Sequence, residues 1–233
     1  MTCPESPPSI PLPVTAIVPT RDAAAHLSTA LATVAAARPA ETIVIDGASN
    51  DDSIAIARRA SGVRVLSQRS RGLAAARNEA ISAATQPMIA FCDADDRWVE
   101  GGLDALHGAL VAEPDALVAI GMVEPVALDG TESSEGQRAR IGTRLAGFTP
   151  GAMLARREAF EVIGRFDESL SIGADSDWFV RLVQSGHGPL RLDRVVLRKG
   201  LRATSLSADV ERYRRELLVI AARYVARRRS GSP

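Results

Sequence analysis

The stretch FCDADDRW, from Phe91 to Trp98, carries the strongest signal in this chain of 233 residues. The apolar run MIAF that ends at Phe91 is typical of a buried strand, and Asp93, Asp95 and Asp96 follow it directly. Carboxylates gathered where a buried strand reaches the surface repel one another unless a cation or a polyhydroxyl ligand lies between them. The stretch therefore predicts a site for a hard divalent metal and the phosphates that the metal carries. The alternative is an ordinary polar loop after a strand.

The composition is typical of a globular α/β protein. Hydrophobic residues make up 46% of the chain, which is enough for a sizeable core, and aromatic residues make up only 4%, so the core must be mainly aliphatic. The formal net charge is zero, but 12 basic and 4 acidic residues lie between Arg191 and the end of the chain, so this part carries +8 and residues 1–190 carry −8. This asymmetry indicates an acidic site closed by a basic tail, or a tail that meets an anionic partner.

The sequence also predicts a compartment. Cys3 and Cys92 lie far apart and form no CxxC pair, which is typical of a reducing environment. The proline-rich start TCPESPPSIPLP has neither the basic nor the apolar region of a secretory signal. No apolar run reaches the roughly 18 residues that a spanning helix needs. We therefore expect a soluble, cytoplasmic protein.

Apolar runs alternate with helical patterns in the first half of the chain. We expect strands over residues 14–18, 42–45, 63–66 and 87–92, with helices over residues 22–37, 51–60 and 72–84 between them. This alternation predicts an α/β fold with a doubly wound, mainly parallel sheet and helices on both faces. Ligands of such sheets bind outside the carboxyl ends of the strands, where Asp46 and Asp93 both lie.

The alternation fades after about residue 120. The polar, glycine-rich residues 129–149 predict a long mobile loop. DWFVRLVQSG, from residue 177, then predicts a helix, and LRLDRVVLR, from residue 190, predicts a strand. The basic amphipathic segment 210–229 predicts a last helix, for which packing on the domain, a dimer interface and attachment to a membrane surface are the alternatives.

Five segments in this order resemble the GT-A glycosyltransferases of family 2, which use nucleotide-sugar donors. The resemblance covers the chain from about Val14 to Ser207. IVPT resembles the opening strand and turn of that family, IVIDGASNDDS its second strand and acidic turn, GLAAARNEA its Gly-x-x-x-Ala-Arg-Asn helix, and FCDADDRW its DxD strand. RREAFEVIGRFDESL and GADSDWFVRL resemble the region that ends in the catalytic acidic motif. The resemblance implies a GT-A, Rossmann-like fold.

The resemblance also implies where the nucleotide binds. It places Asp46 against the nucleobase, where a carboxylate can accept hydrogen bonds from a uracil imide or a ribose hydroxyl, and Gly47 lets a flat ring approach the backbone. The alternative for Asp46 is the start of an Asx-turn. Pro19, Thr20 and Arg21 lie at the mouth of the same crevice, and Arg21 stands where the family often has an aromatic residue. An arginine can also stack on a base.

The diphosphate and its metal are assigned in the same way. The resemblance places Arg77 near the nucleotide, where its guanidinium can pair with Asp93 or with a phosphate. In an extended segment Asp93 and Asp95 point to the same side. The resemblance implies that Asp93 holds the ribose and that Asp95 coordinates Mg²⁺ or Mn²⁺, which would neutralise charge on the departing nucleoside diphosphate.

Asp175 is the candidate catalytic base. The resemblance implies that this carboxylate takes the proton from an acceptor hydroxyl as the hydroxyl attacks the anomeric carbon, in one displacement that inverts the configuration. Ala174 stands where the family usually has a glutamate, and Asp177 is the alternative base. Arg202 falls where many members carry a metal-binding histidine. Either the metal keeps an extra water there, or Arg202 binds the diphosphate directly, together with the neighbouring basic residues 198 and 199. Loss of activity is the third alternative.

These expectations combine into one interpretation. Residues 1–13 form a leader, residues 14–207 form a GT-A domain with a nucleotide half (14–120) and an acceptor half (121–207), and residues 208–233 form the basic helix. The expected activity is that of an inverting hexosyltransferase that uses a nucleoside diphosphate sugar, UDP-linked, and an acceptor that is a glycan, a peptide or a small metabolite. No nucleic acid partner is expected. The alternatives are a catalytically silent sugar-nucleotide binding protein and a nucleotidyltransferase.

Overall fold

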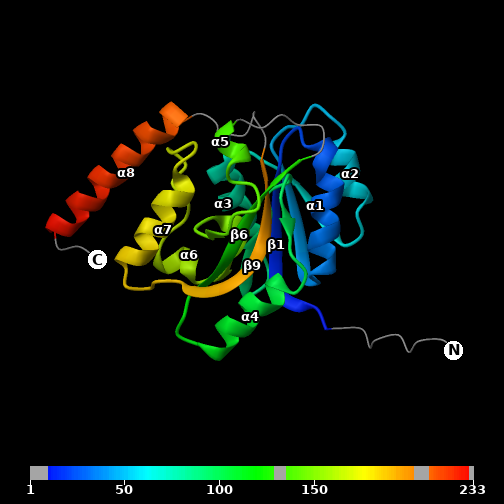
Figure 1. The fold of residues 1–233 in the computed structure, drawn as a ribbon. Helices are drawn as coiled ribbons and strands as arrows, with labels where there is room; N and C mark the ends of the chain where they lie inside the picture. Colours follow the sequence, from blue (N-terminus) through cyan, green and yellow to red (C-terminus); the bar gives the residue numbers. More distant parts are fainter. Residues whose placement is uncertain (1–9, 129–134, 202–209, 231–233) are drawn as a thin grey trace.

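The computed structural model describes residues 10–128, 135–201 and 210–230 (Figure 1). Strands and helices alternate up to β4, as the sequence predicts, and every strand and helix expected there is confirmed. The elements in chain order are β1 (Leu12–Thr20), α1 (Ala24–Ala36), β2 (Pro39–Asp46), α2 (Ser53–Arg59), β3 (Val63–Ser67), α3 (Leu73–Ala83), β4 (Met88–Phe91), β5 (Arg97–Trp98), α4 (Gly102–Ala112), β6 (Val118–Ala127), α5 (Glu135–Arg138), β7 (Leu145–Ala146), the 3₁₀ turn η1 (Pro150–Ala152), β8 (Met153–Arg156), α6 (Ala159–Val162), α7 (Ala174–Gln184), β9 (Leu190–Leu201) and α8 (Val210–Ser230).

All the described strands belong to one sheet, in the order β3-β2-β1-β4-β8-β6-β9-β5, with β7 paired to β6. The first four strands are parallel, so their carboxyl ends lie at one edge. β8 then runs antiparallel to both β4 and β6, while β6 and β9 are parallel to each other. The sequence predicted the parallel part; the antiparallel strand β8 joins that part to the second half of the chain.

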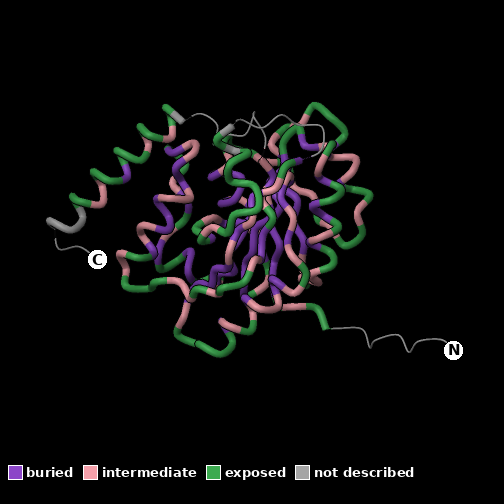
Figure 2. Tube along the Cα trace, in the orientation of Figure 1, coloured by how far each residue is buried: buried purple, intermediate pink, exposed green. Residues whose placement is uncertain are grey.

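Helices cover both faces of the sheet, as predicted (Figure 1). On one face α1, α2 and α4 pack on the aliphatic side chains of the strands. On the other face α3, α6 and α7 enclose a cluster that contains most of the aromatic residues. Figure 2 shows that the buried residues follow the central strands through the middle of the molecule. Apolar side chains on both faces of each central strand explain why the strands read as unbroken apolar runs.

The second half of the chain contains more regular structure than the sequence predicted. Residues 135–149, expected as part of a long loop, contain the short helix α5 and the strand β7. Residues 129–134 lie outside the described part of the chain. The predicted helix and strand after residue 173 are present as α7 and β9, and the exposed residues 186–188 connect them. This connection lies at the end of the sheet away from the carboxyl ends of β1 and β2 (Figure 1).

The last helix, α8, packs against α7 (Figure 1). Ile220 is the buried side chain of its inner face, and Arg223 forms an ion pair of 2.6 Å with Asp167. Of the three alternatives for the basic helix, packing on the domain is therefore observed. Among the described residues, no helix is both long enough and apolar enough to cross a membrane.

Candidate functional site

The ends of β1 and β2 bring together the residues expected at the nucleotide. Thr20 pairs with Asp46 across the two parallel strands, and Pro19 pairs with Ile45. The N–H group of Gly47 donates to the Thr20 carbonyl oxygen at 2.8 Å, which extends the pairing beyond the strands. Three of the predicted nucleotide residues are thus immediate neighbours at one edge of the sheet.

Asp46 is buried and is engaged by its own turn. Its carboxylate accepts hydrogen bonds from the Ser49 hydroxyl at 2.5 Å and from the Ser49 N–H group at 3.1 Å. The Ser49 hydroxyl oxygen in turn accepts from the Asp22 N–H group, and Asp22 accepts from the Asn50 N–H group. This network fixes the two loops to each other, as the Asx-turn alternative anticipated in part. Arg21 beside them is 72% exposed and so has room to move.

The DxD segment forms a tight turn and is not extended. The Asp96 N–H group donates to the Asp93 carbonyl oxygen at 2.9 Å, so the expectation of strand-like alternation is wrong here. The alternation of exposure nevertheless persists, because Asp93 and Asp95 are half-buried whereas Ala94 and Asp96 are buried. The turn therefore leaves the two predicted carboxylates partly exposed and buries the third.

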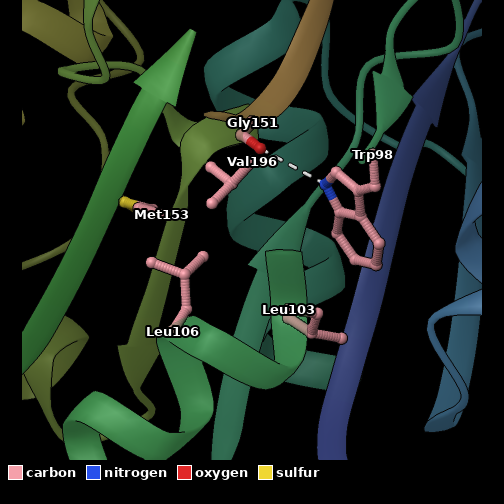
Figure 3. Close-up of a pocket in the computed structure, with 6 residues that line it drawn as sticks. All are labelled: Trp98, Leu103, Leu106, Gly151, Met153 and Val196. Atoms are coloured by element: carbon pink, nitrogen blue, oxygen red, sulfur yellow. Dashed lines mark hydrogen bonds between the residues drawn. The ribbon is translucent and has the colours of Figure 1, made fainter. Parts of the chain in front are cut away.

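Trp98 follows this turn in the chain, and its side chain is buried. Its indole N–H group donates to the carbonyl oxygens of Phe91 and Gly151, at 3.1 and 3.2 Å. Figure 3 shows the ring facing a small apolar gap between α4, β9 and the strand that begins at Met153. A gap of about 10 Å³ is too small for a sugar, so Trp98 packs beneath the site. Trp178 is also fully buried, which gives both tryptophans the packing role.

Arg77 connects the DxD turn to the candidate base. It lies on α3 with only 1% of its side chain exposed, and its guanidinium donates to Asp93 at 2.9 Å and to Asp175 at 2.5 Å. The rings of Phe91 and Phe166 lie 5.9 and 5.6 Å from its central carbon. Although burial opposes the charge, Asp175 and Asp93 raise the pKa of Arg77. The sequence predicted the contact with Asp93 but not the one with Asp175, 98 residues away.

Asp175 lies in the first turn of α7, facing Arg77. Burial raises the pKa of Asp175 and Asp93 adds to the shift, while Arg77 opposes it. Its side chain remains 27% exposed, so a ligand can reach it. Asp177, the alternative base, is buried and forms an ion pair of 2.7 Å with Arg181. Arg181 also donates to two backbone carbonyl oxygens, so Asp177 belongs to a structural network.

Lys199 is a functional candidate that the sequence indicated only as a basic neighbour of Arg202. It lies near the end of β9, with its ammonium nitrogen 3.6 Å from the buried Asp96 carboxylate. Burial raises the pKa of Asp96 to about 7, and Lys199 opposes this shift. Asp96, Asp93, Asp95 and Asp175 together raise the pKa of Lys199, so a cation lies beside the DxD turn. Arg202, which we expected at the diphosphate, lies outside the described residues.

Gly200 allows β9 to reach the DxD turn. Its N–H group donates to Asp96 at 2.9 Å, and a Cβ atom at this position would collide with the Asp95 carbonyl oxygen. From the sequence, a glycine in a strand can indicate that another backbone comes close, but it cannot indicate which one.

A metal ion would have few protein ligands in this site. In the part of the chain that the structure describes, no three His, Cys, Asp or Glu side chains form a group that could hold a metal. Asp93 is held by Arg77, and Asp96 by Gly200 and Lys199. The arrangement fits a hard divalent ion that takes one carboxylate, from Asp95, and completes its shell with substrate phosphates and water.

The profile of one protein family matches most of the sheet and its site. The family is glycosyl transferase family 2, and the match covers residues 15–164. The chain belongs to this family. The match contains the ends of β1 and β2, Arg77 and the DxD turn, and it ends before Asp175.

Curated relatives are similar over most of this chain. The succinoglycan biosynthesis protein ExoU of Rhizobium meliloti is 32% identical over 199 residues, which cover 76% of this chain and 58% of the relative. The pre-mycofactocin glycosyltransferase of Mycobacterium tuberculosis is 32% identical over 202 residues, which cover 79% of this chain and 42% of the relative. The chain thus spans about half the length of these relatives.

Solved structures of other glycosyl-transferring proteins share the fold. The mannosyltransferase PcManGT from Pyrobaculum calidifontis, solved with GDP-Man and Mn²⁺, superposes with a TM-score of 0.69 at 21% identity and covers 96% of this chain and 68% of its own. S. aureus TarS 1-349, solved with UDP-GlcNAc, gives 0.67 at 18% identity and covers 90% and 65%. These similarities establish the GT-A fold of this family 2 chain, as predicted.

Proposed function

We propose that this chain is an inverting glycosyltransferase that moves a hexosyl group from a nucleoside diphosphate sugar, UDP-linked, to an acceptor hydroxyl. The observation that carries the proposal is the double contact of Arg77, which holds Asp93 of the donor half and Asp175 of the acceptor half on one guanidinium. A donor bound at the DxD turn would place its anomeric carbon near Asp175. The relatives named as glycosyltransferases and the solved complexes with nucleotide sugars support the same class.

In this proposal one half of the chain binds the donor and the other half binds the acceptor. Residues 14–120 bind the nucleotide, with the base near Asp46 and Thr20 and the ribose at Asp93. Residues 121–207 contribute Asp175 and receive the acceptor. Burial supports Asp175 as the base, because a carboxylate with a raised pKa binds the proton of a hydroxyl more strongly. The acceptor oxygen forms the new bond to the anomeric carbon, its proton passes to Asp175, and the bond to the diphosphate breaks with inversion.

Two positive charges are available for the diphosphate. Asp95 would hold Mg²⁺ or Mn²⁺, which supplies charge stabilisation to the departing nucleoside diphosphate when it is bound. The solved neighbours with Mn²⁺ support a divalent ion of this kind. Lys199 supplies a fixed positive charge at the same turn. Arg202 remains a proposed diphosphate ligand.

Titration of UDP by calorimetry, with and without Mn²⁺, tests the donor site. We expect wild-type protein to bind UDP more tightly with Mn²⁺, and Asp95→Ala to lose that gain. The control is Asp115→Ala, which removes an exposed carboxylate of another loop and should behave as wild type. If the affinity for UDP is the same with and without Mn²⁺, Lys199 and Arg202 bind the diphosphate instead of a metal. If folded protein binds none of UDP, GDP and dTDP, the sugar-nucleotide proposal is wrong.

Turnover separates an enzyme from a silent binding protein. Wild-type protein should release UDP from at least one UDP-sugar in a hydrolysis screen. Asp175→Asn should bind UDP normally and lose most of this release. Normal UDP binding without UDP release from any donor, with or without an acceptor, would favour the silent protein, for which Ala174 and Arg202 are the specific features.

A further inference from the structure

A carboxylate of α8 holds the segment that leads into α7. Glu216 accepts four hydrogen bonds from three consecutive residues: its Oε1 from the Ser171 N–H group (3.1 Å) and hydroxyl (2.6 Å), and its Oε2 from the N–H groups of Ile172 (2.9 Å) and Gly173 (2.7 Å). A carboxylate offers about four acceptor sites, so these bonds use its capacity fully. Arg212, one turn earlier on α8, lies 3.6 Å from the same carboxylate.

The segment held by Glu216 determines where Asp175 lies. α7 begins at Ala174, directly after the three bound residues, and Asp175 is in its first turn. N–H groups at the start of a helix lack partners within the helix. Glu216 supplies the partners just before this start, and the Gly173 carbonyl oxygen accepts from the Asp177 N–H group at 2.9 Å, which continues the helix.

Two further contacts fix α8 to the same place. The hydroxyls of Tyr213 and Ser176 are 3.0 Å apart, so α8 also contacts the residue after Asp175. Gly173 lets the helix come close, because a Cβ atom there would lie 3.0 Å from the Ile220 Cδ1 atom and 3.2 Å from the Glu216 Oε2 atom. Although burial opposes it, hydrogen bonding from Ser171 and Gly173 lowers the pKa of Glu216 to about 2, which keeps the clamp ionised.

We propose that Glu216 is a positioning residue for the reaction: it clamps residues 171–173 and so holds the carboxylate of Asp175 in line with the donor. The chain has Ala174 where a glutamate was expected beside the base, and the carboxylate of α8 supplies the anchoring from a different element. The inference rests on the proposed function for the role of Asp175, but the clamp itself can be measured without turnover.

The experiment compares Glu216→Gln with Glu211→Gln in the full chain. Both changes remove one negative charge from α8, but Glu211 is exposed and, among the described residues, its partners are Arg214 and Arg215 on its own helix. For Glu216→Gln we expect the amides of residues 171–173 to exchange hydrogen about tenfold faster or more. We expect kcat for UDP release to fall by about tenfold or more, using the UDP-sugar that wild type hydrolyses fastest. UDP affinity and donor KM should stay unchanged, and Glu211→Gln should match wild type throughout.

The outcomes are distinct. Unchanged amide exchange in Glu216→Gln overturns the clamp, and faster exchange with wild-type kcat overturns its role in positioning. If Glu216→Gln does not fold, Ser171→Ala replaces it, because this change removes the hydroxyl that donates to Glu216. A fall in kcat at constant UDP affinity then supports the proposal, and an unchanged kcat overturns it. Absence of UDP binding by wild type refutes the proposed function, and amide exchange then still decides whether Glu216 holds the segment.

Discussion

Arg77 is the residue on which both halves of the site depend. Replacing it with methionine would leave Asp93 and Asp175 without their shared cation while the guanidinium site stays buried. Breaking a buried ion pair in this way costs about 3–5 kcal/mol, so we expect Arg77→Met to lower the free energy of unfolding by about that amount. Urea denaturation measures it. Arg58→Met, on the exposed side of α2, is the control, and equal losses in the two variants would contradict the role of Arg77.

The raised pKa of Asp175 predicts the pH dependence of turnover. A general base must be ionised, so kcat/KM for UDP release should rise with pH and level off above the pKa of Asp175. Because burial raises that pKa, the midpoint of the rise should lie above the ordinary value of 3.8. Asp175→Asn should lose about 10²-fold or more in rate and show no such midpoint. A midpoint that survives in Asp175→Asn would assign the base to another group.

Single residues show where prediction from sequence ends. Asp46, Asp93 and Asp95 could be found because each follows an apolar run that reads as a buried strand. The partners of Arg77 could not be derived in the same way, because Asp175 lies 98 positions along the chain. Glu216 reads as an ordinary charged residue of a helix, and Lys199 was indicated only as a basic neighbour of Arg202. Their roles arise from tertiary contacts that no local pattern encodes.

Among the elements, β9 carries the tightest backbone contact of the site. Gly200→Ala would force the strand away from the Asp95 carbonyl oxygen and from Leu128. Overpacking of this kind costs about 1–3 kcal/mol, and the displaced turn should also weaken UDP binding. Gly108→Ala is the matched control, since Gly108 lies exposed within α4 with no atom near its Cβ position. That change should raise stability by about 0.5–1 kcal/mol, and thermal unfolding distinguishes the two.

The elements were predictable to different degrees. The parallel strands up to β4 and their helices follow from apolar runs and helical spacing, which local sequence determines. The short strands β5 and β7 and the antiparallel course of β8 depend on pairing between distant segments, so the chain gave no local signal for them. The turn at residues 93–96 was predicted as extended because its carboxylates alternate along the sequence directly after an apolar strand run, and the hydrogen bond that closes the turn has no local signal.

The whole molecule should unfold as one unit. Its two halves share one sheet through β4 and β8, and Arg77 bonds across them. The chain has two tryptophans, Trp98 in the first half and Trp178 in the second, so each single-tryptophan variant reports on one half. We expect Trp98→Phe and Trp178→Phe to show one transition each, whose urea midpoint by fluorescence coincides with that by circular dichroism. Separate fluorescence and circular dichroism midpoints within either variant would show that the halves unfold independently.

The connection between α7 and β9 offers a site for chemical attachment far from the donor site. Asp175 lies in the first turn of α7 and Lys199 lies near the end of β9, so the chain leaves the site and returns to it, and the connection at residues 186–188 lies at the far end. Those three residues are exposed, and no atom lies near the Cβ positions of Gly186 and Gly188. A surface linker attached at His187 would therefore immobilise the protein with its donor crevice open to solution.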